Sequence, residues 1–367
     1  MKNKFLYKNI FTYSSLQFSG NVEKYFVENT EKLLVYIVMP RLKNKYNLLR
    51  LYKKGKMIQE KRVKSSTNIF LYYFFWYFYQ MFFLMKYFSS KEKFFLMGGH
   101  PICFFSLGFQ KLLRNAKYVY WIGDYFPGNG FIIKAFERLK KHYHDRVDYS
   151  LYLSDDINKI FNGKVINTKN KKTVMWGVKP VKMEKKLLED EFNMLLVGLI
   201  KDSQGLDTIF NFLKFHNQYK IKIVGICDAK LYKKYIKIIQ ELNIGNQVYF
   251  PNKFFSDKEL LKISKNCHVG IALYNMDRSN PTYYTDPGKV KAYTELHLPV
   301  VISNTSAIVP FVKKFCCGEV ISNIKEELGP ALIEIKNNYE KYQNGLRKFN
   351  DHFYYEKYYG ERFSFLS

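Results

Sequence analysis

The sequence predicts an α/β protein with two doubly wound units in tandem. Short apolar segments typical of buried strands alternate with longer segments of helical periodicity along almost the whole chain. Strands that alternate with helices form parallel sheets covered on both faces. The alternation stops once, at Gly177–Pro180 and the charged stretch Lys182–Glu191, and then starts again. A length of 367 residues suits two domains of ordinary size.

The elements of the first half follow the same order of strand and helix. We expect strands near Asn9–Ser14, Leu33–Val38, Phe94–Met97, Tyr118–Ile122, Tyr149–Leu153 and Thr173–Trp176. The helices between them are expected near Val22–Asn29, Asn68–Tyr87, Ile102–Asn115 and Ile132–His144. Together they predict a first domain over residues 1–185.

The second half repeats the alternation. Strands are expected near Met194–Val197, Lys222–Val224, Val248–Phe250, Val269–Leu273 and Val300–Ile302, with helices that begin near Leu206, Ala229, Asp257 and Lys289. These elements predict a second domain over residues 186–340. The aromatic tail, residues 341–367, is expected to be helical and to pack back on the first domain. Between two such sheets we expect a cleft, because ligands bind at the carboxyl ends of the strands.

Charge and cysteine content narrow the class of protein. The chain has 59 Lys and Arg against 32 Asp and Glu, a net charge of +27. Residues 1–180 hold 32 of the basic and 11 of the acidic residues, so most of the excess lies in the first half. Such asymmetry favours an anionic partner: nucleic acid, a membrane leaflet or a phosphorylated lipid. The cysteine count of five is odd and includes no Cys-x-x-Cys pair, which favours a reducing compartment.

Residues 69–85 (IFLYYFFWYFYQMFFLM) are the most apolar segment, with Gln80 as their one strongly polar residue. Aromatic residues prefer the membrane interface to its hydrocarbon centre. We therefore expect a domain helix or an interfacial helix here, and crossing is not favoured. The first residues contain no long apolar run or cleavage site typical of a signal peptide. These patterns predict a cytoplasmic protein, peripheral on the inner face of the membrane.

Two segments of the second half suit an anionic ligand. The strand ending at Gly198 is followed by Lys201, and glycine at a strand end lets the backbone approach an anion, although a plain turn is the alternative. Asp286 is expected to cap a helix, with Pro287 in its first position. Lys289 then lies in the first turn, where the helix dipole disfavours a cation unless an anion binds. A diphosphate would fit, and a solvated lysine is the alternative.

The segment Leu296–Ser303 (LHLPVVIS) resembles the A-x-G-x-P-V-V segment of GT-B glycosyltransferases of the family-4-like group (glycosyl transferases group 1). Residues 190–325 match that group in order and spacing, and the first half matches by layout. The further segments that carry the similarity are Val197–Gly198, Gly205–Asp207, Val248–Leu261, Ile308–Val312, Gly318–Val320 and Met175–Val178.

The resemblance implies a GT-B fold, with two Rossmann-like domains and a nucleotide-sugar held by the second. Gly198 would lie against the diphosphate. The family's usual Arg and Lys are Leu199 and Gln204 here, so Lys201 and Lys289 are the natural substitutes. The candidate donor-binding residues are Gly198, Lys201, Asn252, Asp286, Gly288, Lys289 and Glu295.

The family's pair of glutamates falls on Tyr284 and Ala292. Asp286 and Glu295 lie near these positions and could contact ribose or sugar instead. Because neither is a motif match, retaining and inverting stereochemistry both stay open.

The first half offers two candidate catalytic residues. Asp124 lies in a segment similar to the family's H-D-x-x-P, with Gly123 in place of the histidine. His100 ends a predicted strand and could act as general base or bind an anion, and a structural role is the alternative. Gly20, Gly99 and Tyr125 are expected in loops on the acceptor side.

Together these observations predict a hexosyltransferase that moves sugar from a nucleotide-diphospho-sugar, UDP- or GDP-linked, to a hydroxyl of a glycan or lipid-linked acceptor. By family analogy it would serve bacterial surface polysaccharide synthesis. No metal is expected, because the sequence has no Asp-x-Asp motif, and no cofactor is expected, because the nucleotide-sugar is a substrate. The alternatives are a catalytically degenerate GT-B binding protein, a sugar-nucleotide epimerase and a basic nucleic-acid-binding protein.

Overall fold

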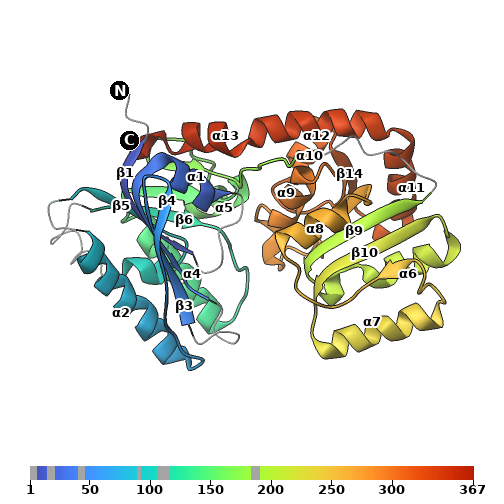
Figure 1. Ribbon diagram of the computed structural model, residues 1–367, viewed down its shortest axis with the longest axis horizontal. Coiled ribbons are helices and arrows are strands. Elements are labelled where there is room, and N and C mark those ends of the chain that lie inside the picture. The colour runs from blue at the N-terminus through green and yellow to red at the C-terminus, as the bar shows by residue number, and fades with distance from the viewer. Residues whose placement is uncertain are drawn as a thin grey trace. The chain divides into compact units, whose positions relative to one another are not determined.

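The chain forms two compact units in the computed structural model (Figure 1). The structure describes residues 6–14, 21–39, 46–88, 92–105, 107, 116–182 and 191–367. The first unit takes in Met1–Gly177 and Tyr355–Ser367, and the second is Val178–Tyr354. Each has a sheet of mostly parallel strands with helices packed on it, which confirms the predicted α/β class.

The first sheet has the strand order β4-β3-β2-β1-β5-β6-β7-β8. Every neighbouring pair is parallel except those of β3, which runs antiparallel to β2 and β4. The strands are β1 (Tyr7–Ser14), β2 (Thr30–Ile37), β3 (Tyr46–Lys53), β4 (Lys56–Lys64), β5 (Phe94–Gly98), β6 (Ala116–Ile122), β7 (Tyr149–Tyr152) and β8 (Lys171–Thr173).

The helices of the first unit are α1 (Val22–Asn29), α2 (Ile69–Tyr87), α4 (Phe131–His144), α5 (Asp155–Asn162) and α13 (Tyr355–Arg362), with short 3-10 turns η1 (Pro101–Phe104) and η4 (Ser364–Leu366). Helix α2 begins after Asn68, whose side chain accepts hydrogen bonds from the N–H groups of Phe70 and Leu71. One face of α2 is buried, and its Phe83 ring packs edge-on against Tyr36 of β2. Helix α13 lies beside α1 (Figure 1).

The second sheet is fully parallel, with the order β11-β10-β9-β12-β13-β14. Its strands are β9 (Phe192–Leu199), β10 (Tyr219–Ile226), β11 (Val248–Tyr249), β12 (Val269–Ala272), β13 (Val300–Ser303) and β14 (Gly318–Ile321). The helices are α6 (Leu206–Phe215), α7 (Ala229–Glu241), α8 (Asp257–Ser264), α9 (Gly288–Glu295), α10 (Val309–Phe315), α11 (Ile324–Asn337) and α12 (Tyr339–Phe353), with 3-10 turns η2 (Asp202–Gln204) and η3 (Pro281–Tyr283).

Three elements differ from the expectation. The hairpin β3–β4 was not predicted, and of the helix expected over 102–115 the described residues show only η1 and Leu107. The tail is two helices rather than one. Helix α12 belongs to the second unit, and the chain enters the first unit again after Tyr354, where an isolated bridge to Val178 marks the crossing. No helix of the described segments combines the length and the hydropathy needed to cross a bilayer.

Candidate functional site

In the second unit, Gly198, Lys201 and Lys289 lie just beyond the carboxyl ends of β9 and β12, whereas Glu295 ends α9, at the opposite edge of the sheet. The strand order reverses between the neighbours β9 and β12, and such a reversal opens a crevice for ligands. Gly198 ends β9 with φ +98°, a conformation that favours glycine, and no atom lies within 4 Å of where a Cβ would stand. The backbone here is therefore open to a ligand.

Lys289 brings a buried positive charge to the same edge. It lies in the first turn of α9, and its Nζ is buried and without a hydrogen-bond partner in the described chain. The ammonium is 5.7 Å from the centre of the Tyr274 ring. Burial, and to a lesser extent the charge of the exposed Lys201, lower the pKa of Lys289 to about 8. A bound anion would remove both unfavourable effects.

Asp286 has a different role from the expected helix cap. The helix begins at Gly288 after Pro287, and no side chain caps it. The Asp286 carboxyl is buried, with an oxygen 3.7 Å from Nζ of buried Lys291. That ammonium in turn lies 3.1 Å from the centre of the Phe353 ring. The pair fixes the start of α9 against the end of α12.

Glu295 and Asn252 both accept hydrogen bonds from backbone N–H groups. Oε1 of Glu295 accepts a hydrogen bond from the N–H of Lys179 (2.7 Å), and its carbonyl accepts one from Val181 (3.0 Å). Oδ1 of Asn252 accepts a hydrogen bond from the N–H of Cys227 just beyond β10 (2.8 Å). The bond of Asn252 joins the loops after β10 and β11 at the crevice edge, whereas the bonds of Glu295 hold residues 179–181 at the far end of α9.

Tyr293 is a residue of this edge that sequence reasoning missed. It lies one helical turn after Lys289, and its hydroxyl accepts a hydrogen bond from the N–H of Val197 (3.0 Å) and donates one to the carbonyl of Ile271 (2.8 Å). The hydroxyl thereby bridges β9 and β12 beyond their last paired residues. A tyrosine four residues after the candidate lysine was the available signal.

The loop after β13 adds two buried hydroxyls, also missed from the sequence. Thr305 Oγ1 and Ser306 Oγ have no hydrogen-bond partner within the described ranges. Ser306 has φ +84°, which is costly for a residue with a Cβ. The N–H of Ala307 bonds to the carbonyl of Thr285, so this loop lies against the segment that leads into α9 (3.2 Å).

In the first unit, His100 and Asp124 follow β5 and β6, which are neighbours in the sheet. The His100 ring lies among aromatic rings, with centre distances of 4.8 Å to Trp76 and 5.2 Å to Phe136. Its Nδ1 accepts a hydrogen bond from the N–H of Ile102 (3.2 Å), which assigns the proton to Nε2. Burial lowers the pKa of His100 to about 4. It is thus a neutral hydrogen-bond donor at neutral pH, and this geometry does not favour the general-base role.

The Asp124 loop is held by a buried pair that the sequence did not reveal. Lys140 Nζ donates to the carbonyl of Asp124 (2.6 Å) and to Glu137 Oε1 (2.8 Å). The same carboxylate oxygen accepts a hydrogen bond from the N–H of Phe126 (3.2 Å). The Asp124 residue itself is exposed, and the protein atoms around its carboxyl raise its pKa while Lys140 acts in the opposite direction.

Among the other acceptor-side candidates, Gly99 is exposed, and a Cβ there would stand 3.4 Å from the carbonyl of Trp121. Tyr125 is half-buried next to Asp124. Gly20 lies outside the described residues. Within the described ranges, no three His, Cys, Asp or Glu side chains are grouped as metal ligands.

Comparisons with known proteins agree at the level of structure. No protein-family model and no curated sequence matches the chain. Sucrose-phosphate synthase from Thermosynechococcus elongatus superposes with a TM-score of 0.66 at 14% identity, over 97% of this chain and 98% of that one. Anabaena HepE in complex with UDP superposes with a TM-score of 0.64 at 12% identity, over 97% of this chain and 99% of that one. The lipopolysaccharide outer core galactosyltransferase WaaB superposes with a TM-score of 0.62 at 15% identity, over 97% of this chain and 98% of that one. The chain therefore has the GT-B fold of glycosyltransferases, as the resemblance of residues 190–325 predicts.

Proposed function

We propose that the chain is a glycosyltransferase that binds a nucleotide-diphospho-sugar at the carboxyl edge of its second sheet. The observation that carries the proposal is the buried Lys289 ammonium, which has no hydrogen-bond partner in the described chain. A buried cation is costly unless an opposite charge pairs with it. A diphosphate against Gly198, Lys201 and Lys289 would supply that charge.

The same groups suit the chemistry of sugar transfer. As the bond between the sugar and the diphosphate breaks, negative charge builds on the leaving group. Fixed cations and the N-terminus of α9 stabilise that charge more in the transition state than in the ground state. Thr305 and Ser306 offer hydroxyl donors beside this helix start.

The acceptor hydroxyl would lose its proton to Asp124. Asp124 is exposed as a residue just beyond β6, and Lys140 holds its backbone in place. Nε2–H of His100, at the end of the neighbouring strand, would orient an acceptor oxygen. We propose a glycan or lipid-linked acceptor in bacterial surface polysaccharide synthesis, supported by the structural likeness to WaaB, a lipopolysaccharide outer core galactosyltransferase.

We propose UDP or GDP as the donor nucleotide, a hexose as the sugar, and transfer without a metal or cofactor. Lys201 and Lys289 supply the positive charge that a divalent ion would otherwise give to the diphosphate. Chelation with EDTA should then leave the rate of transfer unchanged.

We also propose that the protein is cytoplasmic and attaches to the inner face of the membrane through α2. Phe70, Phe74, Phe78 and Phe82 follow one another at intervals of four residues, and each is at least 41% exposed. Residues at this spacing form one face of a helix, and exposed rings at such density are typical of an interfacial helix.

Thermal unfolding in the presence of UDP-, GDP-, ADP- and CMP-sugars tests the donor site. A ligand at about 100 times its Kd stabilises the folded state by about 2.7 kcal/mol. We expect one nucleotide to raise Tm, and Lys289→Ala to abolish the rise. Lys313→Ala, which removes an exposed lysine on α10 of the same unit, is the matched control. Absence of any shift in the wild type would contradict the donor site.

A second candidate is a GT-B protein that binds a nucleotide-sugar without transferring it. Tyr284 and Ala292 occupy the positions of the family's glutamates. The two carboxylates near those positions have structural partners, Asp286 with Lys291 and Glu295 with the N–H of Lys179. A thermal shift without release of free nucleotide in the presence of any glycan acceptor would favour this candidate.

A further inference from the structure

Helix α2 ends before it has covered the whole face of the first sheet. On β2, Tyr36 and Lys32 share the α2 face, because side chains alternate along a strand. Tyr36 packs on Phe83 within the helix, whereas Lys32 lies 4.8 Å from the centre of the Phe88 ring, where the helix has ended. In the described part of the chain, α2 therefore ends short of the row that holds Lys32, at the amino-terminal edge of the sheet.

That row is built from like charges. Lys32 on β2 lies directly opposite Lys53 on β3, and Lys53 lies directly opposite Lys56 on β4. Directly opposed like charges destabilise a sheet, whereas opposite charges in these positions would stabilise it. A local arrangement that opposes stability is typical of a functional surface.

The turn between β3 and β4 adds another lysine at some conformational cost. Lys54 and Gly55 form the two-residue connection with φ +48° and +78°. Turns of this kind favour Asn-Gly or Gly-Gly, because both residues need positive φ. Lysine in the first position therefore brings a charge to the surface where neutral residues fit better.

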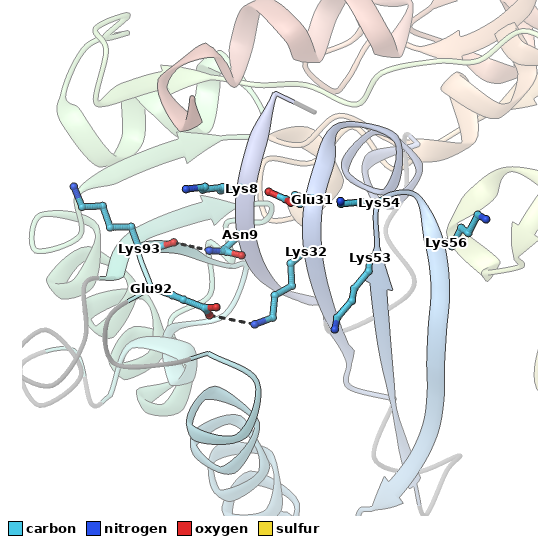
Figure 2. A pocket seen from close by; sticks show the side chains of 9 residues that line it. All are labelled: Lys8, Asn9, Glu31, Lys32, Lys53, Lys54, Lys56, Glu92 and Lys93. Atoms are coloured by element: carbon cyan, nitrogen blue, oxygen red, sulfur yellow. Dashed lines mark hydrogen bonds and ion pairs between the residues drawn. The ribbon is translucent and has the colours of Figure 1, made fainter. Parts of the chain in front are cut away.

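These residues surround a hollow of about 960 Å³ (Figure 2). Its lining consists of Lys8, Asn9, Glu31, Lys32, Lys53, Lys54, Lys56, Glu92 and Lys93. The charged residues of the lining are thus six lysines and two glutamates, and Glu92 is already 3.1 Å from Lys32 Nζ. The other five ammonium groups have no ion pair or hydrogen bond with the described part of the chain.

Protection of a sheet edge does not account for the whole cluster. Charged side chains on an edge strand prevent pairing with other molecules, and this explains Lys56 on β4. Lys8 and Lys32, however, lie on β1 and β2, each of which is paired on both sides. The interior of the sheet needs no such protection.

We propose that this lysine hollow binds the phosphate groups of anionic phospholipids. The exposed aromatic face of α2 runs toward it, and Lys86 lies over the rings of Phe82 and Tyr87 at the end of the helix. Rings at the acyl boundary beside lysines at the phosphate level fit a bilayer surface. The inference rests on the membrane attachment proposed above and is independent of the donor site.

Binding of the full chain to lipid vesicles tests the proposal. The probes are vesicles of phosphatidylcholine alone and vesicles of equal parts phosphatidylcholine and phosphatidylglycerol. Each basic residue near an anionic surface contributes about fivefold to binding, so Lys53→Gln/Lys56→Gln should weaken binding to the anionic vesicles about thirtyfold. Binding to the neutral vesicles, which depends on α2, should not change.

Lys230→Gln/Lys233→Gln on α7 removes the same charge from an exposed face of the second unit and should change binding less than twofold. Equal losses in the two variants would show an effect of overall charge and overturn the proposal. Unchanged vesicle binding in the hollow variant would overturn it too. If that variant at the same time bound inorganic tripolyphosphate less tightly, the hollow would be a site for soluble phosphate chains. The vesicle experiment does not depend on the donor site. If no nucleotide-sugar raised Tm, the results of vesicle binding could still be interpreted in the same way.

Discussion

Tyr293 and Gly270 fit together at the centre of the second sheet: a Cβ on Gly270 would lie 2.3 Å from the Tyr293 ring. The absent side chain makes room for the ring on β12, and the ring carries its hydroxyl to Val197 and Ile271. The link between β9 and β12 at the edge of the crevice thus depends on the small size of Gly270 and on the hydroxyl of Tyr293.

Gly270→Ala should destabilise the protein by about 1–3 kcal/mol, the usual effect of adding a methyl group to a filled core. Tyr293→Phe should cost a similar amount, because it leaves one buried N–H and one carbonyl without their partner. Urea unfolding measures both. A loss smaller than about 0.5 kcal/mol in either variant would show that β9 and β12 close without this bridge.

The contribution of Lys289 to stability should rise with pH in the alkaline range, whereas the buried thiols of Cys103 and Cys317, whose pKa values burial raises, act in the opposite direction. Its folded-state pKa is lowered to about 8, whereas the unfolded chain keeps the ordinary lysine value. Between these two values the unfolded state binds more protons at this lysine, so its contribution to the free energy of unfolding increases as pH rises. The pKa of Lys291 is also lowered to about 8, by burial, and acts in the same direction. The free energy of unfolding, measured with urea from pH 7.5 upward, should therefore rise less steeply with pH in Lys289→Met than in the wild type.

Donor affinity should follow the opposite trend, because the diphosphate needs the protonated ammonium. In the wild type, Kd measured by calorimetry should increase as pH rises above about 8. An affinity that is flat across this range would place the diphosphate away from Lys289.

Asp124→Asn should lower kcat by about 10²–10⁴-fold, the usual contribution of a general base. The pKa of Asp124 is raised above the ordinary value, so the wild-type rate should fall at acid pH before an ordinary aspartate would be protonated. Initial rates across the acid range measure this. The nucleotide-induced rise in Tm should persist in the variant, and its loss would assign Asp124 to folding instead.

Lys53→Glu should stabilise the free protein. The new carboxylate would face Lys32 and Lys56 directly, and each pair changes from like to opposite charge. A gain of about 0.2–1 kcal/mol per pair is expected at low salt and should shrink at high salt. Thermal unfolding at two salt concentrations is the measurement. A loss of stability would mean that the row is already neutralised within the chain.

Phe74→Ser/Phe78→Ser should abolish binding to neutral vesicles while Tm stays nearly constant. The two residues are 59% and 50% exposed, so the fold loses little packing. Phe215→Ser on α6, where the residue is 75% exposed, is the control with the same chemistry. Vesicle binding that survives in the α2 variant would remove this helix from the membrane contact.

Much of the second sheet was predictable because its strands contain short runs that are mostly apolar. Val300–Ser303 is buried at every position, as expected for a parallel strand covered on both faces. The hairpin β3–β4 could not be predicted in this way, because β4 is exposed almost throughout and shows little alternation of buried and exposed residues. Its turn is Lys-Gly, which lacks the usual hairpin signal.

The position of Lys289 was predictable for a local reason: a cation in the first turn of a helix opposes the dipole. The hydrogen-bond partners of the other site residues could not be predicted from the sequence. Glu295 binds the N–H of Lys179, which is 116 residues away, and Tyr293 bridges Val197 and Ile271 from 96 and 22 residues away. Such contacts follow from the packed fold and leave no pattern in the nearby sequence.

The return of the chain to its first unit has a consequence for how the protein is made. The Phe365 ring stacks on Tyr149 at 4.2 Å, and Phe363 packs against Phe26 and Trp121. These rings leave the ribosome only after the whole of Val178–Tyr354. During synthesis, the first unit therefore cannot complete its aromatic core until the whole of the second unit has been made.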